Sequence, residues 1–341
     1  MSLKEIIHPK LDRIIKFGRL HDTKKQQKLP RLAKYLTSRA KLPTPPATLN
    51  LTAPALTVLR DVELNNQLGD CVIAGKTHVD AVWTGNAGRL FAATKEQVIA
   101  QYSAIGHYVP GQPSTDQGCN MADAIAWWAQ NPGADGTKIL GGLSVDATNP
   151  QEIMLAVSLF ENGYLGMCLP DAWINAIDSI SDSTVWDVAG NPDPANGHCV
   201  CGVGYTKDGL IFDTWGDLPL LTWAALAKYS AESGQGEFDV LVSEDMLIKG
   251  QNVAPNGIDW ATLVNDANAI FGGNFTVPPT PSPSPSPAPS PAPAPGATVA
   301  VADVMANLST SFAGFEHALM TRGQALTLAQ GAVTAAIKDS K

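Results

Sequence analysis

An α+β fold is predicted, because helical patterns fill the first part of the chain and strand patterns fill the second. Between residues 50 and 150, apolar residues recur at helical spacing, and two of these runs end at Gly85 and at Pro132-Gly133. From about residue 164 onward, short apolar runs are separated by turn residues. Hydrophobic residues make up 45% of the 341 positions and charged residues 16%, so the chain can bury a sizeable core. A helical lobe followed by a β-rich lobe is the expected arrangement.

The individual elements follow in chain order. A short helix is predicted at 29–36, in a stretch punctuated by proline. Longer helices are predicted at 71–83, 94–105, 121–130 and 150–162. Strands are predicted at 164–169, 197–205, 210–215 and 238–242.

Composition divides the chain into five parts. These are a basic N-terminal arm (1–46), a helical lobe (47–150), a β-rich lobe (151–277), a Pro-rich linker (278–296) and a helical tail (297–341). Ten prolines between 278 and 295 predict a polyproline II spacer of roughly 55 Å. The tail carries apolar residues at helical steps but is too short to bury them alone, so self-association or docking on a larger assembly is expected.

Charge is distributed unevenly along the chain. Residues 1–41 hold twelve Lys and Arg against three Asp and Glu, a net charge of +9, whereas the remaining residues carry −18. The overall charge of −9 argues against a nucleic-acid partner. A basic arm on an acidic body predicts docking of the arm on the body, or an anionic partner for the arm. A solvated, partly helical leader is the alternative.

Targeting and redox patterns narrow the class of protein. No run of eighteen apolar residues predicts a membrane span, and the N-terminus lacks the apolar core of a secretory signal. The odd number of cysteines in a long chain does not predict a disulfide framework: they are Cys71, Cys119, Cys168, Cys199 and Cys201. Cytoplasmic synthesis is expected, with virion association or release without a standard signal as alternatives. No cofactor is predicted, and His198, Cys199 and Cys201 lack the fourth ligand of a zinc site.

Cys71 has the sequence setting of a reactive thiol. It follows Gly69-Asp70 and opens a predicted helix, where unpaired backbone N–H groups and the helix dipole favour the thiolate. The thiolate is the nucleophilic form of cysteine. A buried and inert cysteine is the alternative. His78, two turns along the same helix, is expected to lie out of reach of Cys71 and to be structural.

His198 and Asp213 lie on two successive predicted strands. With a loop at 205–208, Val200 faces Asp213, and His198 lies diagonally from the carboxylate on the same face, at roughly 7–8 Å between backbones. With a tight turn at Asp208-Gly209, Asp213 pairs with Gly204 and lies out of reach of His198. The register of this hairpin decides between the two.

Taken in order, these segments resemble the papain-like cysteine peptidases. QLGDCVIAG (67–75) is similar to the cysteine-and-helix segment of that family, GHCVCGVGY (197–205) to its histidine strand, and FDTWG (212–216) to its Asn-Ser-Trp-Gly motif. DQGCN (116–120) resembles its Gly-Cys-Asn-Gly-Gly segment. The resemblance spans about residues 55–245 and is nearest to divergent bacterial and phage members. It implies a two-lobe papain-like fold with a site in the cleft between the lobes.

The resemblance also implies roles for individual residues. Cys71 would be the nucleophile, and His198 the general base and then the general acid. Asp213 would orient the imidazole, and Trp215 would shield the hydrogen bond between His198 and Asp213. The basic arm would act as a pro-like segment over the body.

The sequence departs from the family pattern at several positions. The oxyanion donor of the family stands six residues before the cysteine, which is Asn65 here, while Gln67 stands four before. Met121 follows Cys119-Asn120 where the family has two glycines, and Leu68 replaces the disulfide partner of that second cysteine. Asp213 replaces the usual Asn, as in the Cys-His-Asp set of transglutaminases.

Thiol-dependent hydrolysis of peptide or isopeptide bonds in a peptide or protein substrate is the function that this set predicts. A catalytically silent papain-like binding or structural module, tethered to a larger assembly such as a phage particle, is the main alternative. Acyl transfer to an amine, as in transglutaminases, is a third hypothesis, motivated by Asp213.

Overall fold

The computed structural model describes residues 5–8, 13–26, 29–33 and 44–244, together with positions 265, 268 and 269. The chain divides into two units, Met1–Pro279 and Thr280–Lys341, and the described residues belong to the first. The predicted Pro-rich linker and helical tail lie outside the described residues.

A largely antiparallel sheet forms the centre of the described part. Its strands, in spatial order, are β6 (Ile139–Ser144), β12 (Glu237–Ser243), β7 (Gly163–Cys168), β9 (Gly197–Tyr205), β10 (Gly209–Asp213), β11 (Leu220–Thr222) and β8 (Val185–Trp186). β4 (Leu49–Asn50) also pairs with β9, and the pair β11–β8 is parallel. Every residue of β9 is buried, which explains its continuous run of small and apolar residues.

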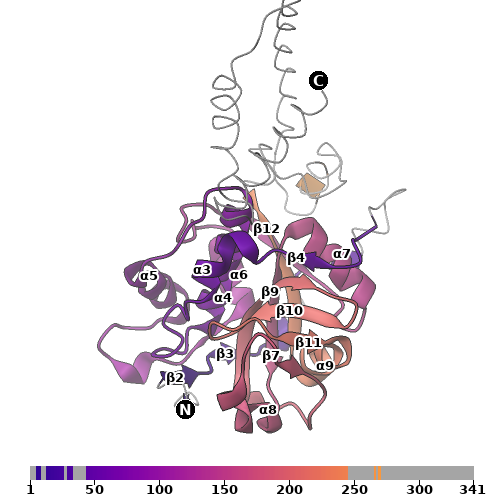
Figure 1. Ribbon diagram of the computed structural model, residues 1–341. Helices are drawn as coiled ribbons and strands as arrows, with labels where there is room; N and C mark the ends of the chain where they lie inside the picture. Colours follow the sequence, from indigo (N-terminus) through magenta and orange to yellow (C-terminus); the bar gives the residue numbers. More distant parts are fainter. Residues whose placement is uncertain are drawn as a thin grey trace, which may run out of the picture. The chain divides into compact units, whose positions relative to one another are not determined.

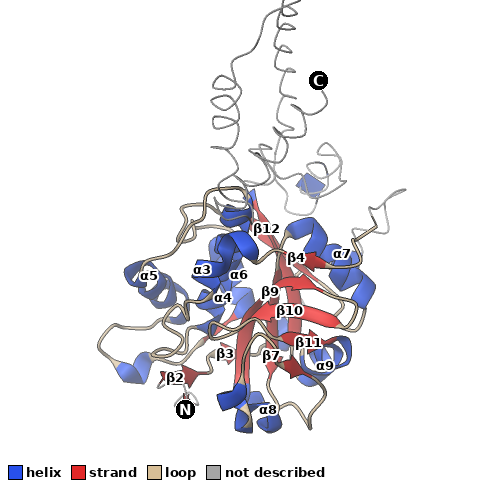
Figure 2. Cartoon of the chain, in the orientation of Figure 1, coloured by secondary structure: helices blue, strands red, loops and turns tan. Residues whose placement is uncertain are grey.

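Helices surround this sheet (Figures 1 and 2). They are α1 (Thr23–Gln26), α3 (Leu56–Leu59), α4 (Cys71–Asn86), α5 (Lys95–Gly106), α6 (Met121–Trp128), α7 (Pro150–Phe160), α8 (Asp171–Asn175) and α9 (Trp223–Tyr229). Short 3₁₀ turns lie at Ala53–Ala55, Pro113–Thr115, Ile177–Ser179, Pro194–Asn196 and Glu232–Gly234. Figure 1 shows α3, α4, α5 and α6 gathered on one side of the body, away from α8 and α9. Among the described residues, no helix is long and apolar enough to cross a membrane.

Helix α4 runs through the interior of the body. Thirteen of its sixteen residues are buried, as expected for a helix that is apolar on most sides. A Cβ at Gly75 would lie 3.3 Å from the Tyr164 ring and 3.4 Å from Cys199 Sγ, so glycine allows the close approach to β7 and β9. The buried Lys76 pairs with Asp80 one turn along. Cys71, at the first turn, is thereby fixed against the sheet.

Local capping explains where the other helices begin. Thr94 and Gln97 form a capping box at α5, and the Asn120 side chain accepts from the first turn of α6. Asn149 caps α7, and Pro150 occupies its first position.

The four longer helices and the four strands predicted from the sequence are present, with ends that differ by a few residues. The short helix predicted at 29–36 lies partly outside the described residues, and Leu32 and Ala33 are helical. Strands β6, β8 and β11 and helix α9 were not predicted. β6 lies within the stretch assigned to the helical lobe, yet it forms an edge of the sheet beside β12.

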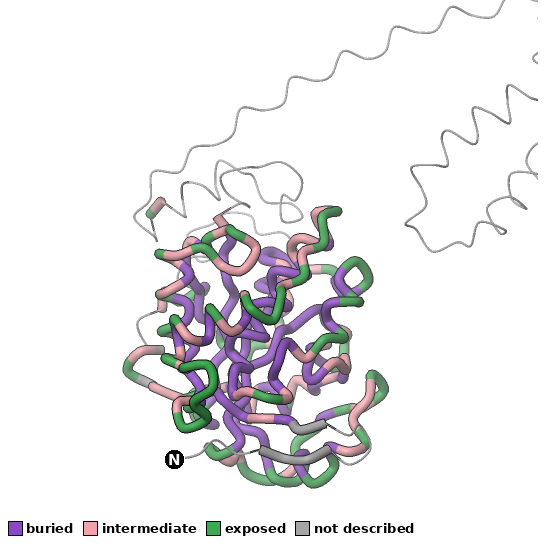
Figure 3. The backbone as a smooth tube through the Cα atoms, turned by 90° about the vertical axis from the view of Figure 1, so that its left-hand side faces the viewer, coloured by how far each residue is buried: buried purple, intermediate pink, exposed green. Residues whose placement is uncertain are grey.

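The described residues of the arm from Ile15 onward are docked on the body, and Ile15, Phe17 and Leu32 join its core. β1 (Glu5–His8) and β2 (Arg13–Lys16) form a hairpin, and β3 (Arg19–Leu20) pairs in parallel with β5 (Cys119–Asn120). Further along, the amide of Ser144 donates to the carbonyl of Pro30 at 2.8 Å, at the edge strand β6. The buried parts of the chain form a continuous interior in Figure 3. The alternative of a solvated leader is therefore wrong for the described residues.

Candidate functional site

The three residues predicted to carry the chemistry line one small cavity. Cys71 from α4, His198 from β9 and Asp213 from β10 surround a space of about 20 Å³. Asn65 and Trp215 also line it. Three segments far apart in the chain therefore meet at one point, although their hydrogen bonds differ from the expected pattern.

Cys71 is completely buried at the start of α4. Burial raises the pKa of its thiol to about 12, against the opposing effect of hydrogen bonds from the backbones of Cys199 and Gly18. The carboxyl group of Asp70, which is also buried, raises it further. The helix N-terminus therefore does not produce a thiolate while the site is covered.

His198 is held between an aromatic ring and a hydroxyl group. Its ring stacks on Trp215 with centroids 4.2 Å apart and an interplanar angle of 14°. Its Nε2 lies 2.9 Å from Oγ1 of Thr214, and its buried Nδ1 has no hydrogen-bond partner. Burial lowers the pKa of His198 to about 3, so the imidazole is neutral.

Asp213 pairs with His78 rather than with His198. Its Oδ2 contacts Nδ1 of His78, a residue that was expected to be structural and distant from the site. His78 lines the same cavity. The predicted hydrogen bond between His198 and Asp213 is absent among the described contacts, and Thr214 takes that place beside the imidazole.

A bulge explains the change of partner. Leu210 faces Tyr205 and Ile211 faces Gly204, but the register then shifts, so that Asp213 faces Cys201. Both registers considered for this hairpin are therefore wrong. Because directly opposed residues share a face of the sheet, Asp213 points to the side of Cys201, where α4 and His78 lie, and away from His198.

The His78–Asp213 pair holds charge in the interior. Burial alone would lower the pKa of His78, but Asp213, and then Glu63, raise it to about 9. Nε2 of His78 lies 3.1 Å from the carbonyl oxygen of Asp61, which can only accept, so this nitrogen is protonated. Burial raises the pKa of Glu63 to about 7. No sequence motif indicated this pair, because its partners lie 135 positions apart and depend on the bulge.

The two candidate oxyanion donors have different surroundings. Gln67 is exposed, whereas Asn65 lines the cavity. The Asn65 amide donates to the carbonyl of Leu68 at 3.1 Å and to Asp70 at 3.3 Å, and its oxygen accepts from the Trp215 indole at 2.9 Å. Asn65 therefore ties the loop before Cys71 to the tryptophan that covers His198.

The arm covers this site. Phe17 is buried with its ring edge-on to His198, at 6.0 Å between centroids, and to Trp215, at 5.8 Å. The next residue, Gly18, contributes a backbone hydrogen bond to the Cys71 thiol and accepts one from the amide of Cys119 at 2.9 Å. The arm thus occupies the space above the thiol and the imidazole.

Glycine makes this close passage possible. A Cβ at Gly18 would lie 1.7 Å from the carbonyl oxygen of Gly69, and a Cβ at Gly118 would lie 2.1 Å from the carbonyl oxygen of Gly18. Asp116 fixes the segments on both sides of Gly18. Its Oδ1 accepts hydrogen bonds from the amide of Gly69 and from the Tyr102 hydroxyl, and this hydroxyl accepts one from the amide of Gly118. β5 therefore pairs with an extended segment, Arg19–Leu20, although the chain lacks the two glycines that the family pattern has after Asn120.

The other cysteines are buried thiols. Cys119, Cys168, Cys199 and Cys201 are all reduced and buried. Within the described part of the chain, no group of three or more His, Cys, Asp or Glu side chains is arranged to hold a metal ion.

No protein-family model and no curated protein sequence matches the chain, but solved structures do. It is similar to xylellain, a cysteine protease from Xylella fastidiosa, with 13% identity over 66% of this chain and 95% of that one, and a TM-score of 0.48. It is similar to digestive procathepsin L 3 of Tenebrio molitor larval midgut, with 13% identity over 60% and 71% of the two chains and a TM-score of 0.44. A Carica candamarcensis cysteine protease in complex with E-64 shares 14% identity over 58% of this chain and 98% of its own, with a TM-score of 0.38. These three solved structures are papain-like cysteine proteases, the group that the sequence motifs resemble.

Proposed function

We propose that this chain is a papain-like thiol peptidase whose site is closed by its own N-terminal arm. The observation that carries the proposal is the meeting of Cys71 and His198 at one cavity, with Trp215 stacked on the imidazole. A cysteine at a helix start beside a histidine is the arrangement needed for a nucleophile and its base. Thr214 acts as the positioning residue for the ring, in place of Asp213.

The reaction would proceed through a thioester. His198 takes the proton of the Cys71 thiol, the sulfur bonds to the substrate carbonyl carbon, and the peptide C–N bond breaks as His198 gives the proton to the leaving amine. A water molecule then attacks the thioester, His198 accepts its proton, and the carboxylic acid product leaves as the thiol is restored.

The covered site is inactive for an electrostatic reason. With a thiol pKa of about 12 and an imidazole pKa of about 3, both groups are neutral near pH 7. Removal of the arm would admit water to the cavity and relieve the burial that causes both shifts. Phe17 and Gly18 are therefore proposed as the inhibitory contacts.

A catalytically silent module is the second candidate. Two observations favour it. Asp213 pairs with His78 and so does not face the imidazole. The Asn65 amide donates to Leu68 and Asp70 and so is not free to act as an oxyanion donor. The hypothesis of acyl transfer to an amine loses its basis, because it depends on Asp213 acting beside His198.

Hydrolysis of a fluorogenic peptide mixture by the full chain carrying Gly18→Val tests the proposal. A valine side chain cannot fit against Gly69, so the arm is displaced and hydrolysis becomes measurable. Adding Cys71→Ala should lower the rate at least about 10³-fold. The matched control Cys201→Ala, a buried cysteine that does not line the cavity, should retain it. Equal rates for the two cysteine variants would support the silent module.

A further inference from the structure

Arg19, the arm residue after Gly18, occupies a built seat in the body. Its side chain is fully buried and pairs with Glu237, with Nη2 at 2.6 Å and Nε at 2.9 Å from Oε1. Nη1 donates to the carbonyl of Gln235 at 2.9 Å and lies 3.9 Å from Sγ of Cys168. Charge-assisted bonds from both edges of a planar guanidinium are specific to arginine.

The shape of the seat fits a long, thin side chain. A Cβ at Gly166 would lie 2.0 Å from Nε of Arg19, and a Cβ at Gly197 would lie 2.3 Å from the Arg19 carbonyl oxygen. Gly166 pairs with Cys199 and Gly197 pairs with Cys168, so the two glycines lie diagonally on one face of β7 and β9. The missing side chain of Gly166 leaves room for the Arg19 side chain, and that of Gly197 leaves room for the Arg19 backbone. Together they form a slot with the guanidinium at its end.

The seat also requires a positive charge. Glu237 is buried, and Asp239, two residues along the same face of β12, is buried with both carboxyl oxygens lacking a hydrogen-bond partner. Burial raises the pKa of Asp239 well above its usual range, and the charge of Glu237 adds to this effect. A buried carboxylate without a cation raises the free energy of the folded protein. When Arg19 leaves, binding of another cation beside Glu237 is therefore favoured.

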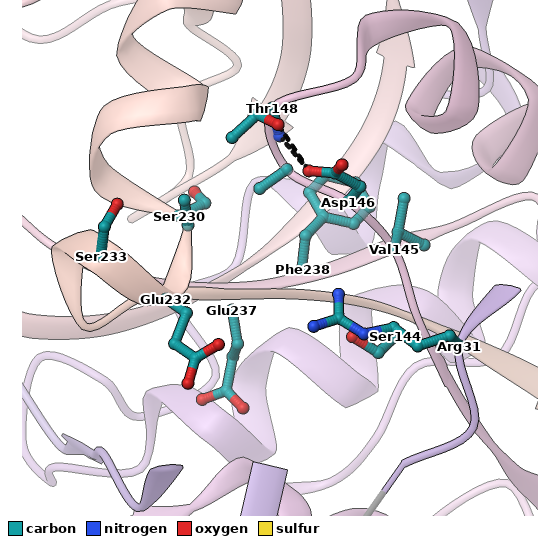
Figure 4. Close-up of a pocket in the computed structure, with 12 residues that line it drawn as sticks. Arg31, Ser144, Val145, Asp146, Thr148, Ser230, Glu232, Ser233, Glu237 and Phe238 are labelled. Atoms are coloured by element: carbon teal, nitrogen blue, oxygen red, sulfur yellow. Dashed lines mark hydrogen bonds between the residues drawn. The ribbon is translucent and has the colours of Figure 1, made fainter. Parts of the chain in front are cut away.

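Glu237 can be reached when the arm leaves. It also lines a pocket of about 270 Å³, together with Glu232, Phe238 and the arm residue Arg31 (Figure 4). Glu237 therefore borders two spaces, the seat of Arg19 and this pocket.

We propose that the slot between Gly166 and Gly197 is the specificity pocket of the site, and that it selects an arginine side chain of the substrate through Glu237. This inference rests on the proposed function, because it assumes that the cleft under the arm receives a substrate. The arm then fills this pocket with the preferred side chain, that of Arg19. Arg19 directly follows Gly18, whose backbone bonds to the Cys71 thiol.

The experiment compares arginine with citrulline, which has nearly the same shape but no charge. Fluorogenic peptides of one sequence, with arginine placed singly at each of six positions, are incubated with the full chain carrying Gly18→Val. At one of the six positions, replacing arginine by citrulline should lower kcat/KM at least about tenfold, because the buried carboxylate of Glu237 then lacks a cation. Glu237→Gln should remove this preference, whereas Glu232→Gln, a change of the same charge at an exposed neighbour, should keep it.

Binding provides a readout that does not need catalysis. A labelled peptide with the sequence of residues 13–22 should bind the same variant at least about tenfold more tightly with arginine than with citrulline at position 19. Hydrolysis without any preference between the two side chains, or equal binding of the two peptides, would overturn the arginine pocket while leaving the peptidase intact. Selective binding without any hydrolysis would uphold the pocket and reject the peptidase.

Discussion

The seat of Arg19 and the cavity of Cys71 are adjacent and buried, but they differ in the contacts that the side chains of the arm make there. In the seat, the guanidinium donates to Glu237 and to the carbonyl of Gln235. In the cavity, Nδ1 of His198 and Oδ1 of Asp213 have no hydrogen-bond partner. The arm therefore bonds to the thiol through the Gly18 backbone and makes its charge-assisted side-chain bonds one residue further on, at the seat.

The seat of Arg19 therefore holds the arm in place, whereas the groups in the cavity are those proposed to react. Buried polar groups are normally paired, and unpaired ones tend to mark functional positions. Nδ1 of His198 and the thiol of Cys71 remain neutral and unbonded to each other beneath the arm. A strong anchor one residue away allows the arm to cover these groups without engaging the imidazole nitrogen.

The largest expected effect is at the anchor. Arg19→Ala leaves Glu237 buried without its cation, which should lower the free energy of unfolding by about 3–5 kcal/mol. Lys25→Ala removes an exposed arm–body pair, with Asp123, and should produce no measurable change. Urea unfolding of the two variants tests the contrast, and similar losses would show that the arm is not anchored at the seat.

A smaller effect is expected at the buried His78–Asp213 pair. Because the pKa of His78 is raised to about 9, its stabilisation is fully present below pH 6.5 and is lost as the pH rises through 9. The loss should be on the order of 2–3 kcal/mol. Glu63, with a pKa of about 7, contributes at lower pH. The five buried cysteines, whose pKa values are raised by burial, add a loss of stability above about pH 8.5, so His78 is reported by the part of the loss that depends on Asp213.

Asp213→Asn should remove the His78 part of this alkaline loss, since the amide cannot pair as a carboxylate does. His107→Asn, at an exposed position with a φ of 58° that asparagine tolerates, should leave it unchanged. Unfolding free energies measured at pH 7.5, 8.5 and 9.5 provide the comparison. A wild-type chain with equal stability across this range would contradict the ion pair.

The smallest effect is expected at Thr214. Thr214→Val keeps the shape of the side chain but leaves Nε2 of His198 without its partner, at a cost of about 1–2 kcal/mol. Nitrogen NMR of the imidazole should show a changed tautomer population. Thr206→Val, which loses a loop hydrogen bond from the amide of Asp208, should leave the imidazole signals unchanged.

Much of the fold follows from local patterns. Helices α4 to α7 combine apolar spacing with clear caps or stops, and both signals lie within a few residues of each helix. β6 contains Gly141-Gly142 and has no alternation, so only its pairing with β12 makes it a strand. β8 and β11 are too short to carry a pattern of their own.

The candidate site was predictable where it depended on order along the chain. Cys71, His198 and Trp215 line the expected cavity. The partner of Asp213 was not predictable, because one extra residue of β9, opposite the step from Ile211 to Phe212, changes the register and the face that Asp213 shares. The seat of Arg19 depends on pairing between segments about 100 and 218 positions apart, for which the sequence offers only complementary charge.

Alkylation of the thiols across pH tests the central claim most directly. In the full chain, Cys71 should react as slowly as the other four cysteines at every pH up to 9, because burial raises its pKa to about 12. In the Gly18→Val chain, Cys71 alone should become reactive, with an apparent pKa several units lower. A Cys71 that reacts equally fast in both chains, or stays inert after the arm is displaced, would contradict a thiol site closed by the arm.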